Sequence, residues 1–183
     1  VYTVNVEPAS GVDVGVNLRT VVRKGVMKNN KWMWESNVVE NETIADPYHT
    51  QASIVIDKDG FIHIAYNMHN MPWQYIISEK PENISKFVFR GQKIVLSEKV
   101  AVKVFNKTPF GSIGTAEIPG NQITYPAFFQ DRSGDIYITY RYALRPKRTW
   151  LERNFVAGIA KYDIRSRKWE SIGGGVTINH EDA

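Results

Sequence analysis

The sequence predicts an all-β fold, and more specifically part of a β-propeller, from three observations. Apolar and polar residues alternate with a period of two along most of the chain, and helical periodicity is nearly absent. A strand–turn–strand unit at residues 52–66 recurs at residues 126–140. The 183 residues include five Trp, nine Tyr and eight Phe, and such side chains suit the half-buried surface of a sheet.

The first full blade is predicted over residues 46–92. Ser53–Asp57 and Phe61–Tyr66 alternate in the manner of paired strands. Asp59 and Gly60 between them are typical of a tight hairpin, because Gly adopts a positive φ without strain. Two further strands complete the blade, at Trp73–Ser78 and Lys86–Arg90.

The second full blade is predicted over residues 122–175. Pro126–Asp131 aligns with Ala52–Asp57, and this alignment places Gly134 on Gly60. Two later strands are expected at Val156–Tyr162 and Arg167–Ile172. Small antiparallel sheets that repeat along a chain are typical of propellers.

The rest of the chain is assigned around these two blades. Val14–Val22 and Lys31–Ser36 are predicted to be the outer strands of an incomplete blade over residues 1–45. Residues 93–121 break the period with Pro and Gly, which predicts an insertion between blades, and residues 176–183 begin a next segment. Closed propellers have roughly 4–8 blades, so we expect either a fragment of a ring or a ring completed by another copy of the chain.

The composition and the net charge limit the classes of partner that the chain is expected to bind. The formal net charge of +4 is compatible with an acidic polysaccharide, and no run of Lys and Arg of the nucleic-acid-binding kind is present. The absence of Cys excludes disulfides, thiolate metal sites and a thiol nucleophile. No stretch approaches the ~18 apolar residues of a membrane span, so no membrane partner is expected.

Four side chains are predicted to meet at one end of the propeller. His49 precedes the first strand of a blade and His69 follows its second strand, and these two positions lie at the same end of a hairpin. Tyr125 and Arg141 bracket the equivalent hairpin of the next blade. Two neighbouring blades therefore offer two imidazoles, a phenol and a guanidinium to one surface.

Three phrases resemble the BNR-repeat-containing propeller family, which includes the propeller-type ulvan lyases. They are Tyr48–Asp57 with its hairpin partner Phe61–Tyr66, Met68–Tyr75, and Thr124–Asp131. The resemblance covers roughly residues 15 to 175. It implies that His49 and His69 line an active cleft with Tyr125 and Arg141 beside them. It also implies a secreted or periplasmic protein, and a structural metal ion in some members.

The chemistry of these side chains agrees with a lyase. β-Elimination at a uronic acid needs a group that neutralises the C6 carboxylate, a base for the C5 proton and an acid for the leaving oxygen. Arg141 and His49 are assigned to the carboxylate, because a guanidinium binds a carboxylate through two hydrogen bonds. Tyr125 and His69 are assigned to the base and acid roles, in either order. No cofactor is required for this reaction.

Four further residues after the second strand are candidates for substrate binding. Asn67 and Asn70 flank the second histidine and are expected to hydrogen-bond sugar hydroxyls. Trp73 and Tyr75 form either a sugar platform or one face of the third strand.

Arg145 is a fifth candidate for substrate binding. It belongs to a basic loop that either attracts an anionic chain or is simply solvated. Other residues are expected to be structural: His63 packs or forms a hydrogen bond within its strand, Tyr66 and Tyr140 pack between blades, and His180 lies in a polar tail.

The leading function is therefore a polysaccharide lyase that cleaves an ulvan-like acidic glycan. The alternatives are a non-catalytic glycan-binding propeller and a sialidase-like glycoside hydrolase. Hydrolysis by paired carboxylates is disfavoured, because Glu is sparse near the predicted cleft.

Overall fold

The structure is a computed structural model, and it describes residues 1–8, 18–43, 50–91, 121–143 and 155–178. These residues form twelve β-strands. Within the same ranges, no helix has the length and apolar character needed to cross a membrane.

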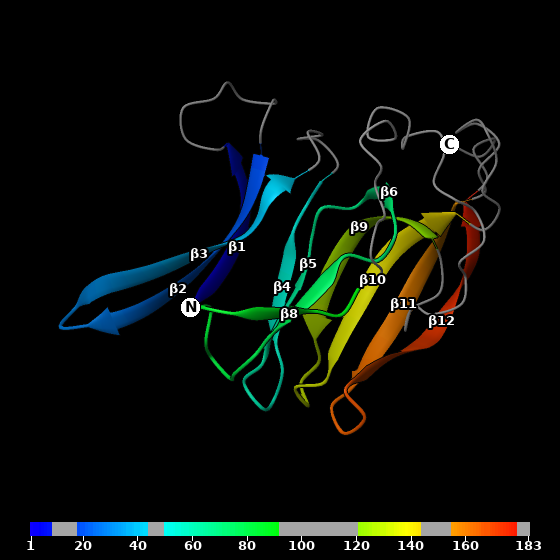
Figure 1. The fold of residues 1–183 in the computed structure, drawn as a ribbon. Coiled ribbons are helices and arrows are strands. Elements are labelled where there is room, and N and C mark those ends of the chain that lie inside the picture. Colours follow the sequence, from blue (N-terminus) through cyan, green and yellow to red (C-terminus); the bar gives the residue numbers. More distant parts are fainter. Residues whose placement is uncertain (9–17, 44–49, 92–120, 144–154, 179–183) are drawn as a thin grey trace.

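The strands make three antiparallel sheets that stand side by side (Figure 1). The first sheet has the order β1 (Tyr2–Pro8), β2 (Leu18–Lys28) and β3 (Lys31–Thr43). The second has the order β4 (Ser53–Ile56), β5 (Ile62–Ala65), β7 (Tyr75–Ser78) and β8 (Phe87–Phe89). The third has the order β12 (Lys168–Ile178), β11 (Phe155–Asp163), β10 (Ile136–Ala143), β9 (Asn121–Gln130) and β6 (His69–Met71).

Successive sheets are placed as propeller blades are. Strand β1 of the first sheet lies beside β4 of the second sheet, and β4 lies beside β9 of the third sheet. The backbone N–H of Phe128 on β9 donates to Ser53 Oγ on β4 at 2.9 Å, which ties the two inner strands together. The all-β, propeller-like fold predicted from the sequence is therefore confirmed.

The repeated turn is built in the same way in both full blades. Gly60 and Gly134 adopt φ values of +83° and +79°. The Oδ1 atom of Asp57 accepts hydrogen bonds from the backbone of Asp59 and Phe61, and Asp131 accepts one from the backbone of Asp135. These aspartates thus hold the hairpins, as Asp commonly does in turns.

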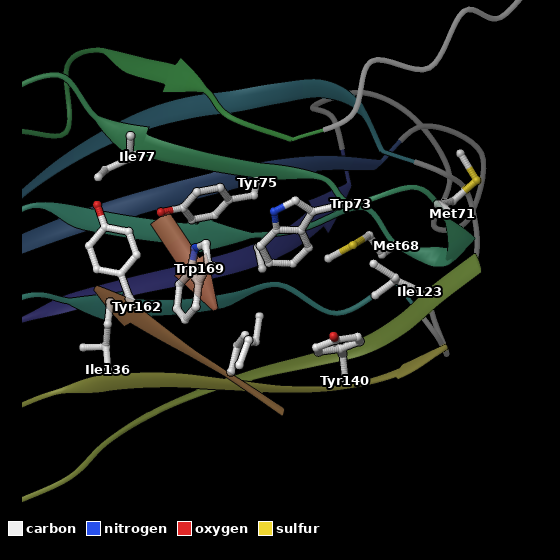
Figure 2. Packing of buried hydrophobic residues seen from close by; sticks show 13 residues of the cluster. Met68, Met71, Trp73, Tyr75, Ile77, Ile123, Ile136, Tyr140, Tyr162 and Trp169 are labelled. Atoms are coloured by element: carbon white, nitrogen blue, oxygen red, sulfur yellow. The ribbon is translucent and has the colours of Figure 1, made fainter. Parts of the chain in front are cut away.

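Two apolar clusters join the three sheets. One lies between the first and second sheets and includes Val22, Ile62 and Ile64. The other lies between the second and third sheets and is rich in aromatic rings (Figure 2). Its members include Met68, Trp73, Tyr75, Tyr140, Tyr162 and Trp169. Burial of these side chains between the sheets supplies the driving force for blade packing.

His63 is a fully buried member of a polar chain inside the second cluster. Its Nε2 atom lies 3.1 Å from Asp57 Oδ2, and its Nδ1 atom lies 2.6 Å from the Tyr75 hydroxyl. Because a carboxylate only accepts hydrogen bonds, Nε2 carries the proton and Nδ1 accepts from Tyr75. The structural role predicted for His63 is confirmed.

Stability is expected to fall as the pH is lowered through the range in which histidine titrates. Burial lowers the pKa of His63, and the hydrogen bond and charge of Asp57 only partly oppose this. The unfolded chain therefore binds a proton that the folded chain does not, so the His63 contribution is present above the ordinary histidine pKa and is lost below it. Urea midpoints measured between about pH 7.5 and pH 5.5 should decrease, and the decrease should be shallower in His63→Gln. Equal slopes for the two proteins would contradict this origin.

The strands of the first sheet differ from the prediction. The sequence did not predict β1, and β2 and β3 are longer than the strands that it predicted. The two strands stay paired out to Lys28 and Lys31 because Asn29 and Asn30 adopt φ values of +48° and +59°, which suit a tight turn that follows the twist of the strands. This hairpin projects beyond the other sheets (Figure 1).

The boundaries between the predicted segments shift slightly. The predicted insertion at residues 93–121 lies outside the described residues except for Asn121, which begins β9. The segment predicted to start at residue 176 begins within β12, which continues to Ile178.

Candidate functional site

Three of the four predicted catalytic residues lie in the described part of the chain: His69, Tyr125 and Arg141. His49 lies outside the described residues, as does the substrate-binding candidate Arg145. His69, Tyr125 and Arg141 therefore define the candidate site in the described residues.

His69 reaches the other two residues through a strand that crosses between blades. It belongs to β6, which follows β5 of the second sheet in the chain but pairs with β9 of the third sheet. His69 is opposite Thr124, and Met71 is opposite Ile123. The sequence predicts that His69 follows the second strand of its own hairpin, whereas the structure pairs it with the sheet that carries Tyr125 and Arg141.

His69, Thr124 and Arg141 form a row across three neighbouring strands. Thr124 is paired with His69 on one side and with Arg141 on the other. Directly opposed residues of antiparallel strands share a face of the sheet, and strands are 4.7–4.9 Å apart. The imidazole and the guanidinium therefore arise from the same face, from Cα atoms about 10 Å apart.

Tyr125 sits in an irregularity of β9. The pairing with β10 shifts between Thr139 and Arg141, so that Tyr125 and Pro126 together oppose a single residue, as in a β-bulge. Tyr125 adopts a φ of +57°, although a residue that precedes proline ordinarily favours extended backbone. Strained residues of this kind cluster at functional sites. The bulge leaves Tyr125 exposed to the extent of 37%.

The guanidinium of Arg141 is held between two aromatic rings. Its Cζ atom lies 4.8 Å from the centre of the Tyr125 ring and 4.2 Å from the centre of the Phe155 ring. Such contacts attract a cation to a ring face and fix its position. The structure therefore brings a positioned guanidinium, a phenol and an imidazole to one end of the third sheet.

Tyr140 supports this end of the sheet from its opposite face. Its ring lies directly over Gly158, where an added Cβ would meet ring atoms at 2.5 Å. Burial raises the pKa of Tyr140, so its hydroxyl stays protonated. Tyr66 packs in the other cluster, and burial together with the charge of Glu40 raises its pKa to about 12. The packing role predicted for both tyrosines is confirmed.

The sugar platform suggested for Trp73 and Tyr75 is wrong. The two rings stack on each other at 5.1 Å within the second cluster, where they are only 1% and 2% exposed (Figure 2). A sugar cannot reach faces that are covered by the third sheet. The other interpretation, that these residues form one face of a strand packed against its neighbour, describes them correctly.

The sugar-binding role predicted for Asn67 and Asn70 was also compared with the structure. Asn67 is 8% exposed and adopts a φ of +52°, so it shapes the bend between β5 and β6 and is not open to a sugar hydroxyl. Asn70 lies in β6, and its side chain is not among those that the structure describes.

The described residues contain no group of three or more His, Asp or Glu side chains that is placed to hold a metal ion. No described residue is therefore assigned to the structural metal ion that the family resemblance allows. The strands β6, β9 and β10 also contain no Asp or Glu. The chemistry available on these strands is that of imidazole, phenol and guanidinium.

Two residues of the site were not predicted from the sequence. Thr124 is fully buried between His69 and Arg141, and Phe155 covers the guanidinium from β11. The aromatic residue at the start of the strand that follows Arg141 was the only signal for Phe155, and nothing in the sequence marks Thr124.

The fold and the site together define a propeller-like protein that carries an arginine, a tyrosine and a histidine at one end of a blade. A family model for BNR repeat-containing proteins matches residues 16–183, and the chain belongs to that family. BNR repeats occur in glycoside hydrolases and related enzymes, which relates this chain to glycan-directed β-propellers. No curated protein matches the chain.

Proposed function

We propose that this chain carries the catalytic groups of a polysaccharide lyase that cleaves a uronic-acid-containing, ulvan-like glycan. The observation that carries the proposal is the contact of Arg141 with Tyr125 on the strand that also pairs with His69. A guanidinium beside a phenol and an imidazole matches the needs of β-elimination. An extracellular glycan substrate would place the protein outside the cytoplasm.

In the proposed reaction, Arg141 binds the C6 carboxylate of the uronate. One of the pair Tyr125 and His69 removes the C5 proton, and the electrons of that C–H bond form the C4–C5 double bond. The bond between C4 and the glycosidic oxygen breaks, and the other member of the pair protonates the leaving oxygen. Fixed positive charge stabilises the enolate-like carboxylate in the transition state.

The clamp on Arg141 supports this role physically. The rings of Tyr125 and Phe155 hold the guanidinium, so less side-chain freedom is lost when a carboxylate binds. The cation also interacts more strongly with a substrate where the surrounding rings displace water. His49, which the resemblance places in the same cleft, is proposed to help orient the carboxylate.

A sialidase-like hydrolase is the second candidate, favoured by the occurrence of BNR repeats in glycoside hydrolases. Hydrolysis in most such enzymes uses a pair of carboxylates. The absence of Asp and Glu from β6, β9 and β10 favours elimination over this alternative.

Ultraviolet absorbance distinguishes the two chemistries. Elimination creates a conjugated unsaturated uronate, whereas hydrolysis does not. Incubation of the full-length protein with a panel of acidic polysaccharides, including ulvan, is expected to give rising absorbance with at least one of them. New reducing ends without that rise would indicate the hydrolase, and the absence of both would leave only a glycan-binding function.

A further inference from the structure

A cavity of about 460 Å³ lies between the second and third sheets, away from the site described above. It is bounded by β7 and β8 on one side and by the turn between β11 and β12 on the other. Its lining includes Phe61, Tyr75, Arg90, Tyr162, Arg167 and Lys168. Phe155 and Tyr162 are seven residues apart on β11, so the cavity lies about 23 Å from the Arg141 clamp.

The cavity combines apolar walls with hydroxyl groups. Tyr75 and Tyr162 are buried members of the aromatic cluster between the sheets, and both border the cavity. Ser78 and Ser166 add hydroxyls to the lining. A cavity of this size and mixed lining is typical of small-ligand sites.

The charge of the cavity is positive and is not balanced from within. Arg90, Arg167 and Lys168 converge on it from two different sheets, and none of them forms an ion pair with a carboxylate of the described residues. Among the lining residues that the structure describes, Glu79 is the single carboxylate, and Lys86 already binds it at 2.6 Å. Cations gathered around a concave, partly apolar surface raise the local potential for anions.

Arg167 is directed by the backbone and by an aromatic ring. It adopts a φ of +56° in the turn between β11 and β12. Its guanidinium lies over the ring of Phe61, with Cζ 4.8 Å from the ring centre. The turn of the third sheet thus places a cation against a ring of the second sheet, and both residues line the cavity. A basic turn that was merely solvated would not need this contact.

We propose that this cavity is a binding site for one anionic sugar unit, whose carboxylate or sulfate group is bound by Arg90 and Arg167. The two arginines offer planar, charged donors to the acid group, and the exposed Ser166 and half-buried Phe61 of the lining suit a pyranose. The choice of a sugar over another small anion rests on the proposed function. The site holds an acidic glycan at a distance from the groups that cleave it.

The test is a titration of the full-length protein, followed by NMR or calorimetry, with D-glucuronate, galactose 6-sulfate, D-glucose and inorganic sulfate. These small probes have no glycosidic bond to break, so binding is measured whether or not the protein is a lyase. Glucuronate or galactose 6-sulfate is expected to bind, and glucose is not. Which of the two binds more tightly distinguishes a carboxylate from a sulfate ester as the natural group.

The double variant Arg90→Gln/Arg167→Gln is expected to weaken the binding of the acidic sugar by at least about 10-fold, because hydrogen bonds to charged groups are the strong ones. Arg132→Gln serves as the matched control, since Arg132 is exposed in the turn between β9 and β10, and it should change the affinity by less than about twofold. Equal weakening by both variants, or loss of binding only in Arg141→Gln, would overturn the site. Binding of inorganic sulfate without either sugar would overturn its assignment to glycans, and no binding at all would overturn the proposal while leaving the lyase untouched.

Discussion

Replacement of Tyr125 by phenylalanine is expected to lower kcat on an acidic glycan by about 10²–10⁴-fold with little change in KM. The substitution keeps the ring that holds the Arg141 guanidinium at 4.8 Å and removes only the hydroxyl that we propose exchanges a proton. Ground-state binding by Arg141 is thereby preserved, so the loss belongs to the chemical step. The rate of unsaturated product formation by the full-length protein provides the measurement.

Tyr137→Phe is the matched control for this experiment. Tyr137 lies on the same sheet, and its hydroxyl donates to Asp131 at 3.1 Å in the opposite turn. Its loss should leave kcat within about twofold of the parent and affect stability alone. A Tyr125→Phe protein that retains full kcat would remove Tyr125 from the proton-transfer pair.

Replacement of Trp73 by alanine is expected to destabilise the fold by about 3–5 kcal/mol. Trp73 is 1% exposed and stacks on Tyr75 within the cluster that joins the second and third sheets. The deletion leaves a cavity that packed sheets close only partly, and the loss is a large share of the 5–15 kcal/mol typical of a folded domain. Urea unfolding of the parent and the variant measures the difference.

Trp32→Ala provides the comparison on the exposed hairpin. Trp32 is 46% exposed on β3 and contacts Trp34, so its loss should cost about 1 kcal/mol or less. If Trp73→Ala instead left the unfolding midpoint unchanged and abolished glycan binding, the sugar-platform interpretation would be restored.

The features that the sequence predicted are those with short-range signals. Asp57 and Gly60, like Asp131 and Gly134, mark their turns by residue type, because few residues accept a positive φ or cap a hairpin. The alternation of four or more residues around them was enough to predict the strands of both blades. The place of Arg141 at the end of β10 followed from the same alignment.

The features that the sequence could not predict depend on contacts between blades. β6 has only three residues, too few for a periodic signal, and its partner β9 lies much later in the chain. The backbone conformation of Tyr125 could not be predicted locally, because a residue that precedes proline favours extended backbone and the bulge imposes a positive φ. The burial of Trp73 is decided by the third sheet, and a platform and a packed face have the same spacing in sequence.

The crossing strand β6 has a consequence for the integrity of the site. The ladder that joins β6 to β9 pairs only His69 with Thr124 and Met71 with Ile123, whereas the ladders between β10 and β11 and between β11 and β12 are longer. Proteins open locally at free energies well below that of global unfolding, and segments with few contacts open most readily. Release of β6 would disassemble the trio of His69, Tyr125 and Arg141 while both blades stay folded. The arrangement of this trio would then depend on a local equilibrium that is separate from global unfolding.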